Sequence, residues 1–279
     1  MSFRIDRLAT LLLFSPVRRR TIDGNSLIPI LMYHSIADDD DAQMHPYYKT
    51  TTSPRVFREH MQELHDRGYS TVSLDEAVAV LQGGIPTSGR VVITFDDGYS
   101  DFYRHAFPEL SRHKFTATVF LPTAYIGNQA IQFKGRDCLT WTEVRELRKY
   151  GTSFGSHTVT HPQLSSLEAR TVKDELVNSK QTIEQNLGES VNSFAYPFAF
   201  PETRKSFVAM LRHTLVDCGY SNGVSTCIGT ARPHEDQYFL RRLPMNSLDD
   251  GELFAAKLQG GYDWLHKVQY ASKRLRAYL

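Results

Sequence analysis

The sequence predicts an α/β fold, a distorted TIM-like barrel of about seven or eight β/α units that form a single domain. Apolar, β-branched runs alternate with amphipathic helical patterns, and no long linker, internal repeat or low-complexity tract interrupts them. Such alternation is typical of a parallel sheet wrapped by helices, and this number of units favours a closed barrel over an open sheet. Several of the apolar runs end in reactive polar residues, which in such barrels meet at the carboxyl ends of the strands.

The expected strands are short runs rich in β-branched and aromatic residues, each bounded by polar or glycine-containing segments. In chain order they cover residues 27–34, 69–74, 91–95, 115–121, 152–155, 193–196, 220–225 and 239–244.

The expected helices fill the intervals between these strands. Ser53 and Pro54 supply an N-cap and a proline at the first helical position, and Gly68 ends that helix. Thr140 and Ser165 each stand three residues before a glutamate, a capping box that favours a helix start. Helices are expected over residues 53–68, 75–81, 100–113, 140–150, 165–188 and 202–218, and over 249–279 with a break at the glycine pair 260–261.

The composition excludes several classes of protein. Of the 279 residues, 41% are hydrophobic and 23% are charged, which is typical of a globular domain rather than a disordered or fibrous chain. The formal net charge of +1 gives no electrostatic reason to expect a nucleic-acid partner. The cysteines, Cys138, Cys218 and Cys227, show no C-x-x-C spacing, so we expect reduced thiols rather than disulfides or a cysteine metal site.

Residues 1–26 are expected to be a basic and apolar leader, followed by the barrel domain at 27–279 with a helical C-terminal tail. Two arginines precede a short apolar run at 8–14, and three more follow it at Arg18–Arg20. The run is shorter than the roughly 20 residues that cross a bilayer, and no small-residue cleavage site follows it. We therefore expect a cytoplasmic protein, with peripheral contact between residues 1–20 and the inner face of a membrane as the alternative.

Two adjacent carboxylates, Asp96 and Asp97, follow the apolar strand at 91–95 and precede Gly98. Adjacent strand residues point to opposite faces, so we expect one aspartate to bind a metal ion and the other to handle a proton. An ordinary Asp-Gly turn also explains this short pattern when it is taken alone.

Two histidines four residues apart, His157 and His161, follow the short strand at 152–155. This spacing can bring both imidazoles to one side of a helical turn around a metal ion, although part-buried structural histidines also explain it. A barrel would place them on the same rim as the two aspartates. Two imidazoles and one carboxylate make a three-ligand site with open positions, as hydrolytic zinc sites require.

The segments T-F-D-D-G at 94–98 and S-H-T-V-T-H at 156–161 resemble the first two motifs of the polysaccharide deacetylases, the chitin-oligosaccharide-deacetylase homology family of carbohydrate esterases. The resemblance extends from about residue 28 to residue 245, and it implies a distorted (β/α) barrel with Asp96 as general base. The metal ligands that it implies are Asp97, His157 and His161. Zinc is the default metal, and iron, cobalt, nickel or manganese also suit these ligands.

The chain departs from the family's third motif, which carries an arginine that orients the catalytic aspartate. Here the segment reads F-A-Y-P-F-A, with Ala195 at the position of that arginine. This segment is also similar to a family branch that acts on poly-N-acetylglucosamine-type polymers and lacks the arginine. Arg241 or Arg242, at another strand end, is the expected substitute, although a solvated strand edge explains both equally well.

The second departure concerns the general acid, a histidine that usually follows the other motifs. Here the run L-M-Y-H, ending at His34, stands first in the chain, as in family members with a permuted motif order. A barrel has no privileged first strand, so this order preserves the site. His34 is the expected acid, and a structural histidine beside Ser35 is the competing interpretation.

The expected activity is metal-dependent removal of acetyl groups from N-acetylated sugars in a polysaccharide, an oligosaccharide or a lipid-linked glycan precursor. One alternative is a hydrolase of a non-sugar linear amide or cyclic imide. Another, motivated by Ala195, is a catalytically impaired carbohydrate-binding relative. The sequence leaves the oligomeric state open. Side chains expected to contact the sugar are Tyr99, Trp141, Tyr196, Pro197 and Phe198.

Overall fold

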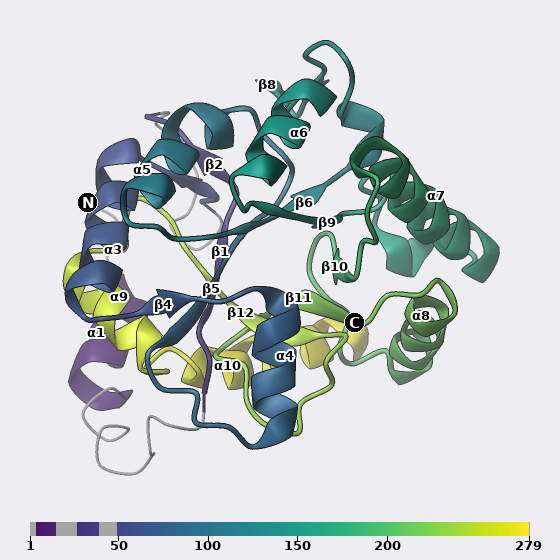
Figure 1. Cartoon of the computed structure of the whole chain (residues 1–279). Coiled ribbons are helices and arrows are strands. Elements are labelled where there is room, and N and C mark those ends of the chain that lie inside the picture. Colours follow the sequence, from purple (N-terminus) through teal and green to yellow (C-terminus); the bar gives the residue numbers. More distant parts are fainter. Residues whose placement is uncertain (1–3, 15–26, 39–48, 279) are drawn as a thin grey trace.

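A computed structural model describes residues 4–14, 27–38 and 49–278, and at its centre is a closed barrel of parallel strands (Figure 1). Around the barrel the strands follow the order β1-β12-β11-β10-β9-β6-β5, and β5 pairs back with β1. These strands are β1 (Ile30–Tyr33), β5 (Arg90–Phe95), β6 (Thr118–Leu121), β9 (Ser153–Ser156), β10 (Ser193–Ala195), β11 (Asn222–Ile228) and β12 (Leu240–Pro244). The predicted fold class is therefore confirmed, with seven strands in the closed ring.

The barrel is distorted at its amino-terminal end. Strand β4 (Ser70–Thr71) pairs with the first residues of β5, Arg90 and Val91, and β1 takes over from Val92 onward. Inside the barrel, alternate strand residues form one buried cluster that Leu74 and Leu81 of α4 (Leu74–Gly83) join. Because these side chains fill the interior, the barrel is a packed core and its chemistry is confined to the rim.

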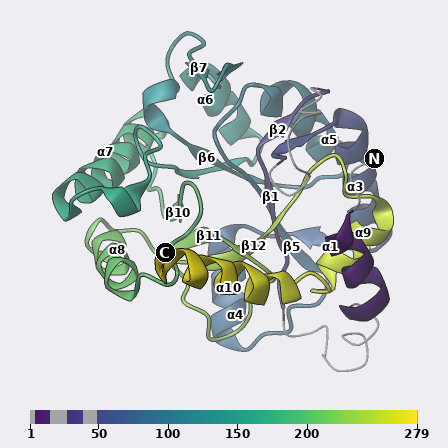
Figure 2. The same ribbon diagram turned by 180° about the vertical axis from the view of Figure 1, so that it is seen from behind.

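Helices surround the barrel, and most begin where the sequence predicts. The Ser53 side chain caps α3, and Thr140 with Glu143 forms the predicted capping box of α6. These and the other helices follow the strands around the outside of the barrel (Figures 1 and 2). Their bounds are α3 (Pro54–Asp66), α5 (Phe107–Arg112), α6 (Trp141–Lys149), α7 (Ala169–Leu187), α8 (Lys205–Asp217), α9 (Gly251–Leu258) and α10 (Trp264–Tyr278). The short pairs β2 (Ser35–Ile36) with β3 (Thr51–Thr52) and β7 (Gln132–Phe133) with β8 (Arg136–Asp137) complete the described strands.

Two helix predictions are wrong in detail. Ser165 does not cap α7: it lies in a 3₁₀ turn, Leu164–Ser166, that the buried Leu164 anchors, and the helix begins later, at Ala169. The helix expected over 100–113 is divided into a π-helical turn, Phe102–Ala106, and α5. Pro108 at the start of α5 has no backbone N–H, so an uninterrupted ladder of helical hydrogen bonds cannot run through it.

The first described residues, 4–14, pack against the C-terminal helices of the barrel domain. Residues 4–14 form α1 (Ile5–Ala9) and a π-helical turn, Thr10–Phe14, beside α9 and α10 (Figure 2). The Phe14 ring stacks on Trp264 with centroids 4.7 Å apart. Residues 15–26, which include Arg18–Arg20, lie outside the described part of the chain. Within the described part, no helix combines the length and the apolar character needed to cross a membrane.

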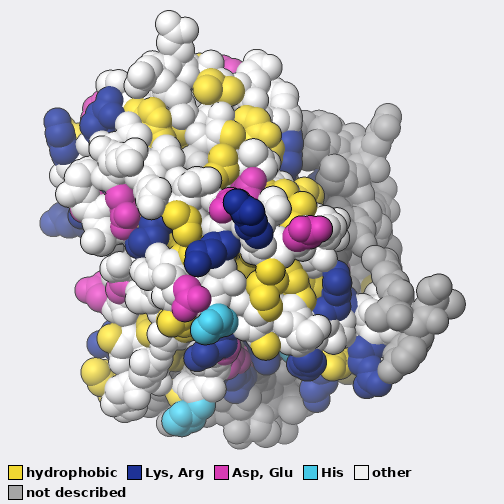
Figure 3. Space-filling model, turned by 90° about the vertical axis from the view of Figure 1, so that its right-hand side faces the viewer, with side chains coloured by type: hydrophobic (Ala, Val, Ile, Leu, Met, Phe, Trp, Pro, Cys, Tyr) yellow, Lys and Arg dark blue, Asp and Glu magenta, His cyan; other side chains and the backbone are white. Residues whose placement is uncertain are grey.

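The charged surface fits the near-zero net charge. On the face in Figure 3, Lys and Arg side chains are interspersed with Asp and Glu side chains, and no block of one sign dominates. This agrees with the formal charge of +1.

Glu202 links α10 to the rest of the domain, and its ionisation makes the free energy of unfolding depend on pH. Its carboxylate accepts hydrogen bonds from His266 Nε2 at 2.7 Å and Lys273 Nζ at 3.0 Å. Burial alone raises the pKa of Glu202, but these two partners outweigh burial and lower the pKa from 4.5 to about 2. Since the folded-state pKa is the lower one, the stabilisation is complete above about pH 4.5 and is lost as the pH falls towards 2.

We expect Glu202→Gln to lower the free energy of unfolding at pH 7 by up to about 3 kcal/mol. At pH 3 the gap between variant and wild type should shrink by roughly half or more. Chemical denaturation at both pH values measures this difference in the free energy of unfolding. The control is Glu59→Gln, because Glu59 forms an exposed ion pair with Arg55. A gap that stays constant with pH would contradict this account of Glu202.

Candidate active site

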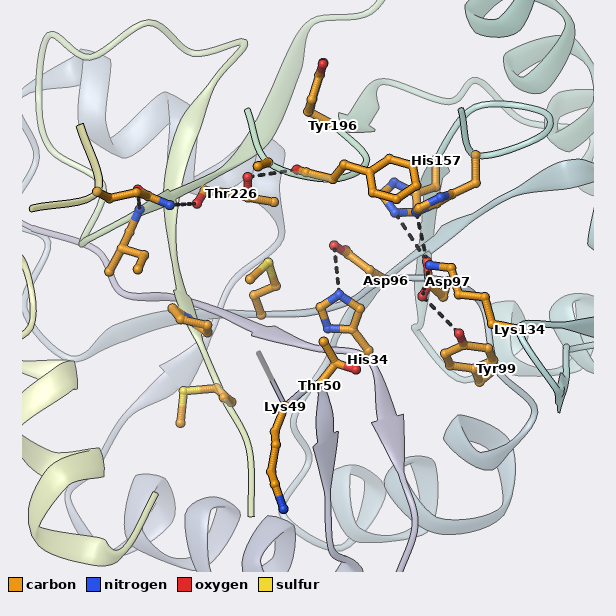
Figure 4. A pocket seen from close by; sticks show the side chains of 18 residues that line it. His34, Lys49, Thr50, Asp96, Asp97, Tyr99, Lys134, His157, Tyr196 and Thr226 are labelled. Carbon is orange, nitrogen blue, oxygen red and sulfur yellow. Dashed lines mark hydrogen bonds and ion pairs between the residues drawn. The ribbon is translucent and has the colours of Figure 1, made fainter. Parts of the chain in front are cut away.

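The reactive side chains that the sequence singles out lie at the carboxyl ends of the barrel strands, around a pocket of about 400 Å³. His34 follows β1, Asp96 and Asp97 follow β5, and His157 follows β9. All four line the pocket, together with His161 (Figure 4). The barrel thus brings together residues that are far apart in the chain, as the parallel topology predicts.

The turn at the end of β5 sends the two aspartates to different surroundings. Asp97 and Gly98 both adopt left-handed backbone, with φ of 69° and 60°. A Cβ at position 98 would lie 3.0 Å from Leu121 Cδ2, so glycine suits the position in both conformation and space. The Asp-Gly turn and the candidate site are therefore one structure, and the turn is what separates the directions of Asp96 and Asp97.

Asp97, His157 and His161 form a buried cluster whose ligand atoms lie within 4.8 Å of one another. Asp97 Oδ1 is 3.6 Å from His157 Nε2 and 3.3 Å from His161 Nε2, and it has no hydrogen-bond partner. A buried carboxylate oxygen without a partner is costly unless a cation completes it. The donor set and this incomplete oxygen fit a divalent metal ion with two imidazoles and one carboxylate.

The spacing of the histidine pair indicates a helical turn, but the pair lies on a loop. Residues 157–161 form an irregular loop in which Thr158 and His161 have φ of 69° and 56°. The His161 N–H donates to Thr158 Oγ1 at 3.0 Å, and Glu175 accepts from the backbone N–H of Val159 at 2.7 Å. Left-handed non-glycine residues carry strain that the surroundings must support. The loop is therefore held by its own hydrogen bond and by Glu175 of α7 in the shape that turns both imidazoles to Asp97.

Outer contacts prepare the cluster for a cation. His157 Nδ1 donates to the Ala195 carbonyl at 2.8 Å, so the lone pair of Nε2 faces Asp97. Burial lowers the pKa of His157 to about 4, which keeps the imidazole neutral at pH 7. Burial alone raises the pKa of Asp97, but its close neighbours, among them His161 and Lys134, outweigh burial, so the net pKa lies well below the usual range. Neutral imidazole and ionised carboxylate are the states that bind metals.

The second oxygen of Asp97 points to the other side of the cluster. Tyr99 donates its hydroxyl to Asp97 Oδ2 at 3.1 Å, and Lys134 Nζ lies 3.4 Å from the same oxygen. Figure 4 shows both side chains approaching Asp97 from the side away from His157. Lys134 comes from the tip of the β7–β8 hairpin, and nothing in the sequence around it indicated a place in the site.

Asp96 is paired with Arg242, one of the two arginines expected to replace the missing one. Arg242 Nη1 and Nη2 donate to the two Asp96 oxygens, each at 2.7 Å, and Nε donates to the Ser225 carbonyl at 3.0 Å. Both side chains are fully buried. Burial alone raises the pKa of Asp96, but the Arg242 charge outweighs it and lowers the pKa below the usual range. Asp96 is thereby held as an ionised, fixed carboxylate.

Arg241 has a different place. Its Nε lies 3.4 Å from Glu235 Oε1, and the side chain is partly exposed. Neighbouring strand residues face opposite sides, so only one of the two arginines of β12 can enter the barrel. Ala195 belongs to the buried cluster inside the barrel, and Arg242 Cζ lies 5.9 Å from the ring centroid of Phe120 in the same cluster. Although Ala195 stands at the position of the family's arginine, Asp96 still has a guanidinium partner, which Arg242 supplies.

His34 stands beside Asp96 on the open side of the pocket (Figure 4). Its Nε2 is 3.9 Å from Asp96 Oδ2, and its Nδ1 is buried without a hydrogen-bond partner. Burial lowers the pKa of His34, against the opposite effect of Asp96 and Asp97. The imidazole is thus placed to exchange a proton with a group bound in the pocket.

The five side chains expected to contact a sugar divide into two groups. Tyr99, Tyr196 and Phe198 line the pocket; the Phe198 side chain is 49% exposed, whereas the Tyr196 hydroxyl points away from Asp96 (Figure 4). The prediction for Trp141 is wrong, because its ring at the start of α6 lies in the hydrophobic core. Pro197 is not among the residues that line the pocket. Lining residues that the sequence did not indicate include Met32, Lys49, Lys134, Thr226 and Gln269.

A β/α barrel that carries two imidazoles and a carboxylate on its catalytic rim, beside a second carboxylate fixed by arginine, defines the class of metal-dependent hydrolases. Comparison with known proteins narrows this class. A family model described as polysaccharide deacetylase matches residues 83–215. The chain is 31% identical over 235 residues to YxkH of Bacillus subtilis (strain 168), a protein named after polysaccharide deacetylases, covering 83% of this chain and 76% of that protein. The chain belongs to the polysaccharide deacetylase family, whose members are hydrolytic carbohydrate de-N-acetylases.

Further relatives agree with this membership. The chain is 25% identical over 203 residues to the poly-β-1,6-N-acetyl-D-glucosamine N-deacetylase of Staphylococcus aureus (strain MRSA252), covering 69% of this chain and 67% of that enzyme. The Streptococcus pyogenes deacetylase PplD, solved with acetate, superposes with a TM-score of 0.70 at 25% identity over 83% of this chain and 98% of PplD. IcaB from Ammonifex degensii has the same fold, with a TM-score of 0.67 at 23% identity over 84% of this chain and 97% of IcaB. The family resemblance expected from the two motifs is confirmed.

Proposed function

We propose that this chain removes acetyl groups from N-acetylglucosamine residues of a glycan of the poly-β-1,6-N-acetyl-D-glucosamine type, with zinc as the bound metal. Family membership makes it a metal-dependent carbohydrate N-deacetylase. The glycan type is supported by the similarity to the staphylococcal enzyme. One observation carries the proposal: the Asp96–Arg242 pair and the Asp97, His157 and His161 cluster line one pocket.

The metal has a defined place and task in this proposal. Asp97, His157 and His161 would hold a divalent cation, which would lower the pKa of water and polarise a carbonyl oxygen. The tautomer of His157, fixed by the Ala195 carbonyl, and the ionised state of Asp97 are what the chain contributes. Zinc is favoured by the imidazole and carboxylate ligands, and iron, cobalt, nickel and manganese are its competitors.

Proton transfer is divided between Asp96 and His34. Asp96, kept ionised and oriented by Arg242, accepts a proton from the attacking water. His34 donates a proton to the departing sugar amine, which leaves poorly without one. His34 Nε2 lies 3.9 Å from Asp96 Oδ2, so the proposed acid and the proposed base are neighbours at one part of the pocket wall.

The pocket walls suit an uncharged, hydroxyl-rich ligand with an apolar face. Phe198, half exposed at the rim, and the Tyr99 ring offer surfaces for a sugar ring. Asp96 and Asp97 are the only carboxylates among the described residues that line the pocket, and both are engaged within the site. Thr226 of β11 and Gln269 of α10 also line the wall, and hydrogen bonds to the backbone hold both side chains in place: Thr226 Oγ1 donates to the Phe198 carbonyl at 2.9 Å, and Gln269 Nε2 donates to the Thr226 carbonyl at 3.0 Å.

The test is acetate release from β-1,6-linked N-acetylglucosamine oligomers by the purified protein. We expect release by the zinc-loaded protein, loss after chelation, and recovery when zinc is returned. Chelated protein given magnesium serves as control, because magnesium prefers oxygen ligands. Turnover of linear amides or cyclic imides without acetate release from any N-acetylated sugar would favour the non-sugar alternative. Glycan binding without turnover would favour the impaired relative.

A further inference from the structure

The N-terminal helical segment exposes an unusual number of apolar side chains. Ile5, Leu12 and Leu13 are 70%, 69% and 61% exposed, and Leu8 and Phe14 are also exposed beside them. A surface helix of a globular protein ordinarily turns its apolar side to the core. Here five apolar residues of one ten-residue segment, 5–14, face outward instead, and we call them the apolar patch.

The polar side chains of the same segment attach it to the domain. Arg7 donates to Asp250 and Glu252, both at 2.7 Å, and the Tyr262 hydroxyl donates to Asp6 Oδ2 at 2.6 Å. Trp264 Nε1 donates to Thr10 Oγ1 at 3.0 Å. These contacts fix the rotation of the segment about its axis. The usual arrangement is therefore reversed: apart from the Phe14 ring, which stacks on Trp264, polar groups bind the protein while the apolar side chains are presented to the surroundings.

We propose that the apolar patch docks on the surface of a membrane that contains anionic lipid. The segment is ten residues long, about 15 Å of helix, which is small for a protein–protein interface of roughly 800 Å² per partner. It suits shallow insertion at the boundary between headgroups and acyl chains. The acidic groups of α9 already neutralise Arg7, but the sequence continues with Arg18–Arg20, a cluster of the charge that anionic headgroups attract.

The N-terminal segment is connected to the pocket wall through chain neighbours of lining residues. Arg4 Nη1 donates to the Leu248 carbonyl at 3.2 Å, and Leu248 follows the pocket-lining Met245 by three residues. On the other side, Trp264, which stacks on Phe14, begins the helix whose Gln269 lines the pocket. Docking through the patch would therefore hold the pocket near the membrane surface, within reach of glycans at that surface. The docking itself does not depend on the proposed function.

The experiment is co-sedimentation of the full chain with vesicles of phosphatidylcholine alone or mixed with phosphatidylglycerol. We expect binding to the mixed vesicles, weaker binding at high salt, and at least about tenfold weaker binding after Leu12→Glu with Leu13→Glu. Ile85→Glu with Val216→Glu, at exposed apolar positions elsewhere, should bind like the wild type. Acetate release from a soluble oligomer should be unchanged in both variants, which separates this proposal from the proposed function.

Three outcomes would overturn the membrane proposal. The wild type could fail to sediment with either kind of vesicle. The Leu12 and Leu13 variant could bind as the wild type does. The wild type could be a dimer in solution that this variant dissociates, without vesicle binding, which would assign the patch to a second copy of the chain.

Discussion

Asp96→Asn is expected to lower the rate of acetate release by about 10²- to 10⁴-fold, the usual range for loss of a general base. The amide keeps the size of the carboxylate but has no oxygen basic enough to take a proton from water. The turn after β5 directs Asp96 away from the cluster of Asp97, His157 and His161, so the metal content of the variant should equal that of the wild type. Steady-state kinetics with metal analysis of the same preparation measures both quantities.

The control for Asp96→Asn is a partly buried carboxylate that does not line the pocket. Asp101 accepts a hydrogen bond from Ser35 Oγ at 2.5 Å, and we expect Asp101→Asn to retain activity within about tenfold of the wild type. If Asp96→Asn kept a tenth or more of the wild-type rate at full metal content, the general base would have to be sought elsewhere. If it lost its metal as well, Asp96 would belong to the ligand set instead.

The sequence predicts the barrel and the central cluster because both depend on local patterns. Strand-ending motifs place Asp97, His157 and His34 on one rim whatever the details of the helices, since parallel strands all end on the same side. The different surroundings of Asp96 and Asp97 follow from the turn at Gly98, which the Asp-Gly pair in the sequence indicates. These features need no knowledge of packing between distant segments.

The predictions that are wrong or open depend on such packing. Trp141 looks like a rim aromatic next to a capping residue, but the first turn of α6 buries its ring against the core. Ser165 matches a capping box, yet the buried Leu164 draws the chain into a 3₁₀ turn before the helix starts. Lys134 reaches Asp97 from a hairpin 37 residues further along the chain, and no local pattern marks that contact.

The choice between Arg241 and Arg242 likewise required the structure, and it yields the second large expected effect. Arg242→Ala leaves the Asp96 carboxylate buried without its cation, which should destabilise the fold by about 3–5 kcal/mol and remove most of the activity. Arg242→Lys keeps the charge but cannot give two parallel hydrogen bonds, so we expect milder destabilisation and still reduced kcat. Thermal unfolding and kinetics of both variants measure this, with Arg241→Ala as the matched control.

Arg242 acts through Asp96, so its effect must differ from that of a residue that only supports the fold. Without the guanidinium the pKa of Asp96 should rise, because burial would then be opposed only by weaker partners, and the acid limb of kcat in Arg242→Lys should move to higher pH. KM should change less than kcat. In an Asp96→Asn background the Arg242→Lys substitution should cost little further activity, since the carboxylate that Arg242 orients is already gone. Full additivity of the two losses would mean that Arg242 serves the reaction by another route, and an unshifted acid limb would leave it a purely structural residue.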